Sequence, residues 1–277
     1  MTLQDGSTVH RYGEITGNNG VSHLDLDVTQ VIKLQVFFPR SGAVSQLNYS
    51  LCPPQGGTGP LETTPAPTAS PVVECPLVHL DFNNEGLSRG TYLHDQLKDK
   101  YGLTVTAIAR PGTGYTPNGA ARIFDTARTG GRNGDTDLGS PNRDCPGGGP
   151  GIGAGGGPSS PFANCDPLGY VLIIQESNKW TPDDNARGGS LLFDFDTPVT
   201  VKDLSIFDID EHSSVDVLLT HAGGATTPYE TGWTGDNGVY PLTVDQANIK
   251  QIKVTFPGSG AVNHIDFRHC PPGWTPP

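Results

Sequence analysis

Residues 204–209 read Leu204-Ser205-Ile206-Phe207-Asp208-Ile209 and alternate, for most of their length, between apolar and polar side chains. Successive side chains of an extended strand point to opposite faces, so this period places Leu204 and Ile206 on the same face. β-branched and aromatic residues also favour strands. The segment therefore predicts a strand of an antiparallel sheet that has one face buried.

Similar runs recur along the chain, separated by residues that favour turns. Together they predict an all-β fold, an antiparallel β-sandwich with either a jelly-roll or an immunoglobulin-like layout. One short helix is expected within Thr91–Tyr101, where Leu93 and Leu97 are four residues apart. The nine predicted strands are Leu77–Phe82, Leu103–Ala109, Ala121–Thr126, Tyr170–Gln175, Ser190–Phe195, Val199–Ile209, Val215–Thr220, Ile249–Phe256 and Ala261–Phe267.

The composition agrees with strands and loops. Of the 277 residues, 37 are glycine and 25 are proline, which disfavour long helices, and 34% are hydrophobic, enough for the core of a sandwich. The formal net charge is -12 and the basic residues form no stripe. This charge repels nucleic acids and anionic membranes, so cations or neutral glycans are the better candidates for partners. No apolar run approaches the roughly 20 residues that a membrane span needs.

The chain contains an internal repeat at a spacing of 218 residues. Residues 1–54 align without a gap with residues 219–272, and 20 of the 54 positions are identical. Agreement over this length predicts a tandem array of one kind of domain. The identical positions include Thr16-Gly17, Asn19-Gly20-Val21, Ser41-Gly42-Ala43-Val44 and Cys52-Pro53-Pro54, which align with Thr234-Gly235, Asn237-Gly238-Val239, Ser259-Gly260-Ala261-Val262 and Cys270-Pro271-Pro272.

The repeat predicts four parts in the chain. Residues 1–54 are the C-terminal part of a β-sandwich repeat, 55–74 a linker rich in Pro, Thr, Ser and Gly, 75–272 a complete repeat, and 273–277 the start of the next linker. The apolar run Val31–Phe38 of the partial copy needs a covering surface. We expect that cover from preceding residues of the same polypeptide or from a neighbouring copy, and the second case gives a head-to-tail filament.

The five cysteines predict disulfides of an oxidising compartment, because none forms a C-x-x-C pair typical of zinc or redox sites. Cys75 and Cys270 bracket the complete repeat, and Cys145 and Cys165 flank a glycine-rich segment. These positions predict the bonds Cys75–Cys270 and Cys145–Cys165. Cys52 is the counterpart of Cys270, so its partner is expected before Met1. The pattern indicates a protein that is secreted, extracellular or on the cell surface.

The order of several motifs in the complete repeat resembles widespread extracellular β-sandwich modules. Similar modules occur in bacterial surface proteins with C-terminal sorting signals and in algal or diatom cell-surface and adhesive glycoproteins. The resemblance implies an extracellular, non-enzymatic module and implies no particular ligand. It covers most of residues 77–267 and depends on Leu80-Asp81-Phe82, Ala121-Arg122-Ile123-Phe124-Asp125-Thr126, Gly134-Asp135-Thr136-Asp137-Leu138-Gly139 and Gly188-Gly189-Ser190-Leu191-Leu192-Phe193.

Acidic residues gather at predicted strand ends and turns of the complete repeat. Alternating pairs such as Asp135/Asp137 and Asp208/Asp210 place two carboxylates on one side of an extended segment, where a hard cation relieves their repulsion. Outside the cell that cation is Ca²⁺. The alternative is that these carboxylates only cap turns. The predicted calcium ligands are Asp125, Asp135, Asp137, Glu176, Asp208 and Asp210.

The sequence predicts no catalytic centre. It contains no G-x-S-x-G, H-E-x-x-H or P-loop motif. Gly151-Ile152-Gly153-Ala154-Gly155-Gly156 has the G-x-G-x-x-G spacing, but no predicted strand precedes it, so it is interpreted as a flexible loop. A glycosidase that uses two acids is a distant alternative.

The sequence predicts glycans both as covalent modifications of the chain and as possible ligands. Asn48 lies in the sequon Asn48-Tyr49-Ser50, and Thr63, Thr64, Thr68 and Ser70 of the linker are candidates for O-glycosylation. Trp180, Trp233 and Trp274 are candidates for stacking on sugars or for packing. The leading hypothesis is a structural or adhesive subunit of an extracellular fibre, sheath or wall glycoprotein, which binds copies of itself. The alternative is a calcium-dependent carbohydrate-binding module.

Overall fold

The structure, a computed structural model, describes residues 75–110, 120–129, 135–209 and 214–270, together with two short strands before residue 34. Contacts divide the chain into two compact units, Met1–Thr68 and Ala69–Pro277, and the division falls within the predicted linker. Among the described residues, no helix has the length and apolar character to cross a membrane.

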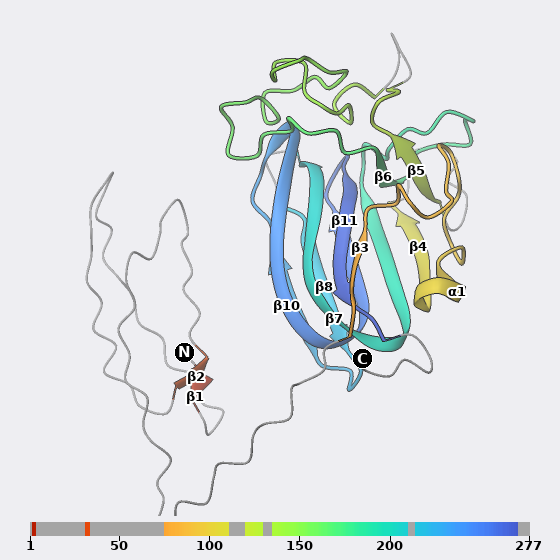
Figure 1. Cartoon of the computed structure of the whole chain (residues 1–277), viewed down its shortest axis with the longest axis vertical. Coiled ribbons are helices and arrows are strands. Elements are labelled where there is room, and N and C mark those ends of the chain that lie inside the picture. The colour runs from red at the N-terminus through yellow and green to blue at the C-terminus, as the bar shows by residue number, and fades with distance from the viewer. Residues whose placement is uncertain are drawn as a thin grey trace, which may run out of the picture. The chain divides into compact units, whose positions relative to one another are not determined.

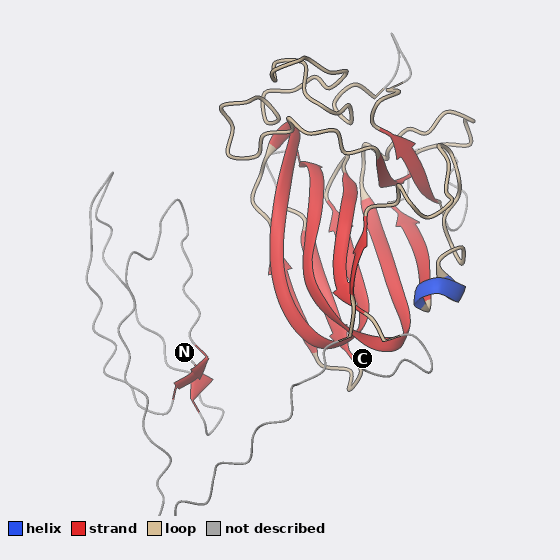
Figure 2. Ribbon diagram, in the orientation of Figure 1, coloured by secondary structure: helices blue, strands red, loops and turns tan. Residues whose placement is uncertain are grey.

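The second unit consists almost entirely of antiparallel strands, as predicted (Figures 1 and 2). Nine strands form one hydrogen-bonded sheet with the order β5-β6-β11-β7-β10-β8-β9, and β3 and β4 join it by pairing with β11 and β7. The strands are β3 (Leu77–Leu80), β4 (Leu103–Ala109), β5 (Ala121–Asp125), β6 (Tyr170–Ile174), β7 (Gly189–Ile209), β8 (Asp216–His221), β9 (Thr226–Glu230), β10 (Gly235–Phe256) and β11 (Ala261–Arg268).

A long bent ribbon made of β7 and β10 produces the sandwich. The two strands pair over their whole length, from Gly235↔Ile209 to Phe256↔Gly189, with register shifts between Thr243 and Gln251. Irregularities of this kind bend a ribbon. β10 occupies one edge of β7, and on the other edge β4 pairs with the first half of β7 while β11 pairs with the second half. The ribbon therefore contributes to both layers of the sandwich.

Side chains from both halves of the ribbon meet in one core. Phe195, in the first half of β7, lies 5.2 Å from the ring of Phe267 in β11, and Tyr101 contacts the same ring edge-on at 5.8 Å. Residues 204–209 are buried on both faces rather than on one. The reason is a second apolar cluster behind the sheet, in which Phe207 packs with Phe124, Leu138, Val171, Ile173 and Ala261.

The predicted helix is much shorter than expected. Only α1 (Lys98–Tyr101) is helical, because the preceding residues pair with β5 instead. Leu93 N donates to Ala121 O and Ile123 N donates to Thr91 O, both at 2.9 Å. Leu93 and Leu97 are both buried in the core. Their spacing of four residues therefore arises from this burial, although no continuous helix joins them.

The first unit shows the same strand pairing as the second unit at the repeat spacing. β1 (Thr2–Leu3) pairs with β2 (Val31–Lys33) through Thr2↔Lys33 and Leu3↔Val31. Adding 218 to these numbers gives Thr220↔Gln251 and His221↔Ile249, which are pairs found between β8 and β10, and both ladders have a register shift at this point.

The disulfide Cys75–Cys270 joins the residues that flank the sheet, as predicted. Its Cα atoms are 4.9 Å apart although 195 positions separate them in sequence. Cys52 lies outside the described residues.

Candidate functional site

The loops that follow β5, β6, β9 and β10, together with the start of β10, gather at one end of the sandwich, at the top of Figure 1. We call this region the loop end: residues 135–166, 175–188, 232–238 and 257–260. It holds the predicted disulfide Cys145–Cys165 and three of the six acidic residues predicted as calcium ligands, Asp135, Asp137 and Glu176.

The glycine-rich segment of the loop end is closely packed, so its interpretation as a flexible loop is wrong. A Cβ atom on Gly151 would lie 2.3 Å from Gly139 O, and one on Gly156 would lie 2.3 Å from Asn237 O. Real Cβ atoms do not come this close to backbone atoms. The glycines are present because the segment lies directly against the backbone at residues 234–237.

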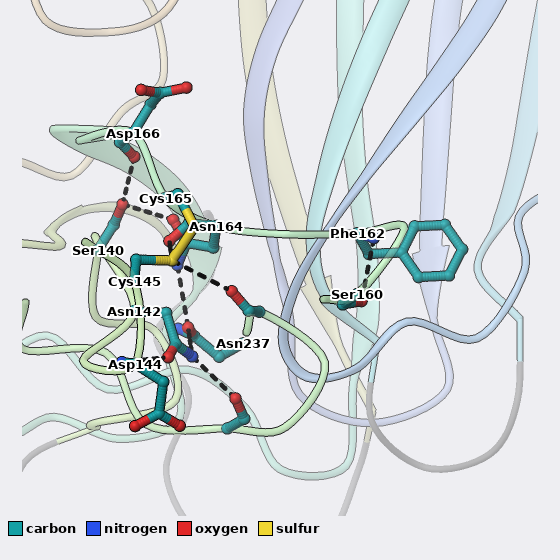
Figure 3. The surroundings of a disulfide bond; sticks show 12 residues. Ser140, Asn142, Asp144, Cys145, Ser160, Phe162, Asn164, Cys165, Asp166 and Asn237 are labelled. Atoms are coloured by element: carbon teal, nitrogen blue, oxygen red, sulfur yellow. Dashed lines mark hydrogen bonds between the residues drawn. A yellow bond between two sulfur atoms is a disulfide. The ribbon is translucent and has the colours of Figure 1, made fainter. Parts of the chain in front are cut away.

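Buried amides around the disulfide connect these loops (Figure 3). Asn237 Oδ1 accepts hydrogen bonds from Asn142 Nδ2 at 2.7 Å and from Asn164 Nδ2 at 3.1 Å. Asn237 Nδ2 donates to the backbone oxygens of Asp137 and Gly139. All three asparagines are buried, and a fully paired buried network of this kind holds loops in one arrangement.

Three acidic side chains, the buried Asp184 and the partly buried Asp135 and Asp137, form a cluster beside this network. Asp135 shares side-chain hydrogen bonds with both Asp137 and Asp184. Burial, and then the charge of Asp184, raise the pKa of Asp135 far above its usual range. Burial raises the pKa of Asp184 to about 7, although Gly260 N donates to its Oδ2 at 2.5 Å. At neutral pH these raised pKa values favour a proton held within the cluster.

The other predicted calcium ligands have different surroundings. Asp125 accepts from Ala127 N at 3.1 Å and lies 3.6 Å from the guanidinium of Arg128. Asp208 is buried and accepts from Asn237 N at 2.6 Å, so it fixes backbone. Glu176 N donates to Asp183 O, and Asp210 lies outside the described residues. Among the described residues, the structure brings the predicted ligands Asp135 and Asp137 together with Asp184, which was not predicted.

An exposed tryptophan projects from the loop after β6. The side chain of Trp180 is 85% exposed. Its backbone is nevertheless fixed, because the buried guanidinium of Arg122 donates to the carbonyls of Gly90, Lys179 and Trp180. The guanidinium also lies over the ring of Tyr92, 4.7 Å from its centroid, and Tyr92 is itself 41% exposed.

A second group of aromatic residues lies beside the glycine-rich segment. Phe162 stacks on Tyr240 with ring centroids 5.5 Å apart, and Trp233 is about half exposed. The ring of Trp233 lies close to Gly235, where an added Cβ would be 3.6 Å from it. Trp274 lies outside the described part of the chain, and so do the predicted glycosylation residues Asn48, Thr63, Thr64, Thr68 and Ser70.

Sequence reasoning missed the central role of Asn237, although the sequence carried a signal for it. Asn237 belongs to the motif shared by both copies of the repeat, in which its counterpart is Asn19. Its φ of +67° is a backbone conformation that asparagine tolerates better than most residues. The contact between Asp184 and Gly260 joins residues 76 positions apart and has no local signal.

No known protein-family profile and no curated protein sequence matches this chain. Three solved structures are similar to it in part. A mutant of the lectin binding domain of Lectinolysin, complexed with Lewis b, has a TM-score of 0.26 and 11% identity over 31% of this chain and 70% of that one. The C-terminal domain of a chitobiase from Bacteroides fragilis has a TM-score of 0.24 and 16% identity, and the match covers 34% of this chain and 70% of that one. A protein designated CpGH89CBM32-4, produced by Clostridium perfringens, has a TM-score of 0.25 and 16% identity, and the match covers 43% of this chain and 93% of that one.

Proposed function

We propose that the second unit is a non-catalytic glycan-binding module of an extracellular protein, and that the loop end is its binding surface. The observation that carries this proposal is Trp180, an exposed ring on a backbone that Arg122 fixes. An aromatic face stacks on the apolar face of a sugar ring, and an immobile platform loses little entropy when it binds.

The surroundings of Trp180 support the same function. Tyr92 offers a second exposed aromatic ring beside Arg122, and Trp233 offers a third on the same loop end. The net charge of -12 favours neutral glycans over acidic ones. The two disulfides are consistent with secretion, which is part of the proposal.

Replacing Trp180 tests the proposal. A glycan array followed by affinity electrophoresis in the best neutral polysaccharide measures binding by the full chain. Trp180→Ala should weaken binding about fivefold or more, since stacking on one aromatic ring contributes on the order of 1 kcal/mol or more. Leu77→Ala is the matched control, because it removes an exposed apolar side chain from β3, away from the loop end.

Two results would contradict this proposal, the first its function and the second the place of its binding surface. One is an array on which the folded wild-type chain binds no glycan. The other is equal binding by Trp180→Ala and wild type, which would show that the exposed ring is not part of the binding surface.

A structural role in a tandem array is the second candidate, and one observation favours it. The pairing of β1 with β2 has the register of β8 with β10 at the repeat spacing of 218 residues. This agreement supports the interpretation of residues 1–54 as part of a second copy of the sandwich. Head-to-tail association of copies stays a prediction, and a monomer in sedimentation of the 277-residue chain would contradict it.

A further inference from the structure

Four polar side chains lie side by side on the outer face of the sheet. Asp266 in β11 pairs with His79 of β3 on one side and with Asp203 of β7 on the other. His264 is two positions before Asp266 on the same strand, so it points to the same face. The alternate residues Ile265 and Phe267 are fully buried in the core. The four side chains therefore point away from the core and toward solvent.

The distances within this group are short. His79 Nδ1 lies 2.5 Å from Asp266 Oδ1, and His264 Nε2 lies 3.3 Å from Asp203 Oδ1. The two imidazole rings are 4.8 Å apart and inclined by 45°. One ligand atom from each of His79, His264 and Asp266 lies within 4.8 Å of the others. At these separations the three atoms are candidates for ligands of one ion.

The register of β11 against β7 places two carboxylates opposite each other, where a positive charge between them is stabilising. Asp203 and Asp266 are directly opposite each other on neighbouring strands, and like charges in this position repel. A cation between the two carboxylates would relieve the repulsion.

We propose that His79, His264 and Asp266 bind a divalent transition-metal ion of the Zn²⁺ class, and that Asp203 orients His264 or completes the site. Two imidazoles with carboxylates suit Zn²⁺, Ni²⁺ or Cu²⁺, whereas Ca²⁺ and Mg²⁺ prefer oxygen ligands alone. A carboxylate on the second nitrogen of a metal-bound histidine is a common supporting contact. The site is separate from the acidic cluster of the loop end.

The contacts have a simpler explanation that makes a different prediction. Cross-strand histidine and aspartate side chains form ion pairs without any metal. In that case Zn²⁺ would bind weakly and without preference among the histidines. A metal site instead requires that these particular side chains, and not other histidines, determine the affinity.

The internal repeat supplies conservative substitutions for the test. At the spacing of 218 residues, Gln46 aligns with His264 and Asn48 aligns with Asp266. The first copy thus has neutral amides of similar size where the second copy has the proposed ligands. His264→Gln and Asp266→Asn are therefore changes that the same fold is expected to accept.

Calorimetric titration of the full chain with ZnCl₂ tests the proposal. Wild type should bind one Zn²⁺ with a dissociation constant in the micromolar range or lower. His264→Gln and Asp266→Asn should each weaken that binding by about 10- to 100-fold. His94→Gln and His221→Gln are the matched controls, because these histidines bond to Val105 O and Ala247 O in other parts of the unit. X-ray absorption at the zinc edge should show nitrogen and oxygen ligands at about 2.0–2.2 Å.

The proposal is overturned if wild type binds no Zn²⁺ at 100 µM, or if the control variants lose as much affinity as the ligand variants. Circular dichroism of each variant shows whether it is folded. An unfolded Asp266→Asn is replaced in the test by His79→Gln, whose side chain is 54% exposed and removable without disturbing the core.

Discussion

Because Gly151 and Gly156 have no side chain, the loops of the loop end can pack directly against each other. Neither has the positive φ that would require glycine, so the requirement is steric: an added Cβ would overlap a backbone oxygen at 2.3 Å. Gly151→Ala and Gly156→Ala should each lower the free energy of unfolding by about 1–3 kcal/mol, as overpacking does. Chemical denaturation of the full chain with the disulfides intact measures the change.

Gly157→Ala is the control for this prediction. A Cβ at Gly157 would have ordinary contact, 3.5 Å from Ala154 O. Alanine there should leave stability unchanged or raise it by up to about 1 kcal/mol, because it restricts the unfolded chain. If all three variants behave alike, close packing is not the reason for the glycines.

At the scale of single residues, the sequence showed which residue types are present but not what they contact. The G-x-G-x-x-G spacing was visible, and it led to the prediction of a flexible loop. The packing of Gly151 depends on Gly139 and on the distant Asn237, and only the folded chain brings these residues together. The role of Asp184 depends in the same way on Gly260.

The acidic cluster between the loops after β5 and β6 makes stability depend on pH. The folded-state pKa values of Asp135 and Asp184 are raised above their unfolded value of about 3.9. Stability from these groups is therefore fully present below about pH 4 and is lost as pH rises toward 7. With chelator present, the free energy of unfolding should fall over this range. Ca²⁺ should reverse much of that fall, because a cation replaces the shared proton.

Asp184→Asn tests the same cluster by removing one charge. Its unfolding free energy should change less between pH 4 and 7 than that of wild type, and it should no longer respond to Ca²⁺. Asp144→Asn removes an exposed carboxylate from the neighbouring loop and should keep the wild-type profile. A wild-type profile unaffected by Ca²⁺ would mean that the shared proton alone stabilises the cluster.

At the scale of elements, strands with an apolar face could be predicted and strands without one could not. β4 has the predicted bounds, and the predicted Ser190–Phe195 and Val199–Ile209 are two halves of β7. β9 reads Thr226-Thr-Pro-Tyr-Glu230 and was not predicted, because it has no apolar face and contains proline. As an edge strand paired only with β8, it tolerates both features. The first part of β10 was also not predicted, because residues 235–238 read Gly-Asp-Asn-Gly, which is typical of a turn.

At the scale of the whole molecule, the repeat was the most informative feature of the sequence. It predicted the bond Cys75–Cys270, which the structure contains, without any knowledge of the strand order. The layout of the sandwich could not be derived in the same way. It depends on the bend in the ribbon of β7 and β10, where register shifts occur at positions that no sequence period marks.

The bond between Cys75 and Cys270 also determines how the domain would carry mechanical load. Tension applied through the predicted linker at 55–74 and through the residues after Cys270 enters and leaves at two Cα atoms 4.9 Å apart. The covalent bond bears that tension, and the 195 positions between the cysteines bear none. In single-molecule pulling the oxidised domain should therefore show no unfolding extension, whereas the reduced domain should lengthen by roughly 65 nm. A chain of such domains would stretch only in its linkers, and unfolding extension from the oxidised domain would show that this bond does not form in the protein.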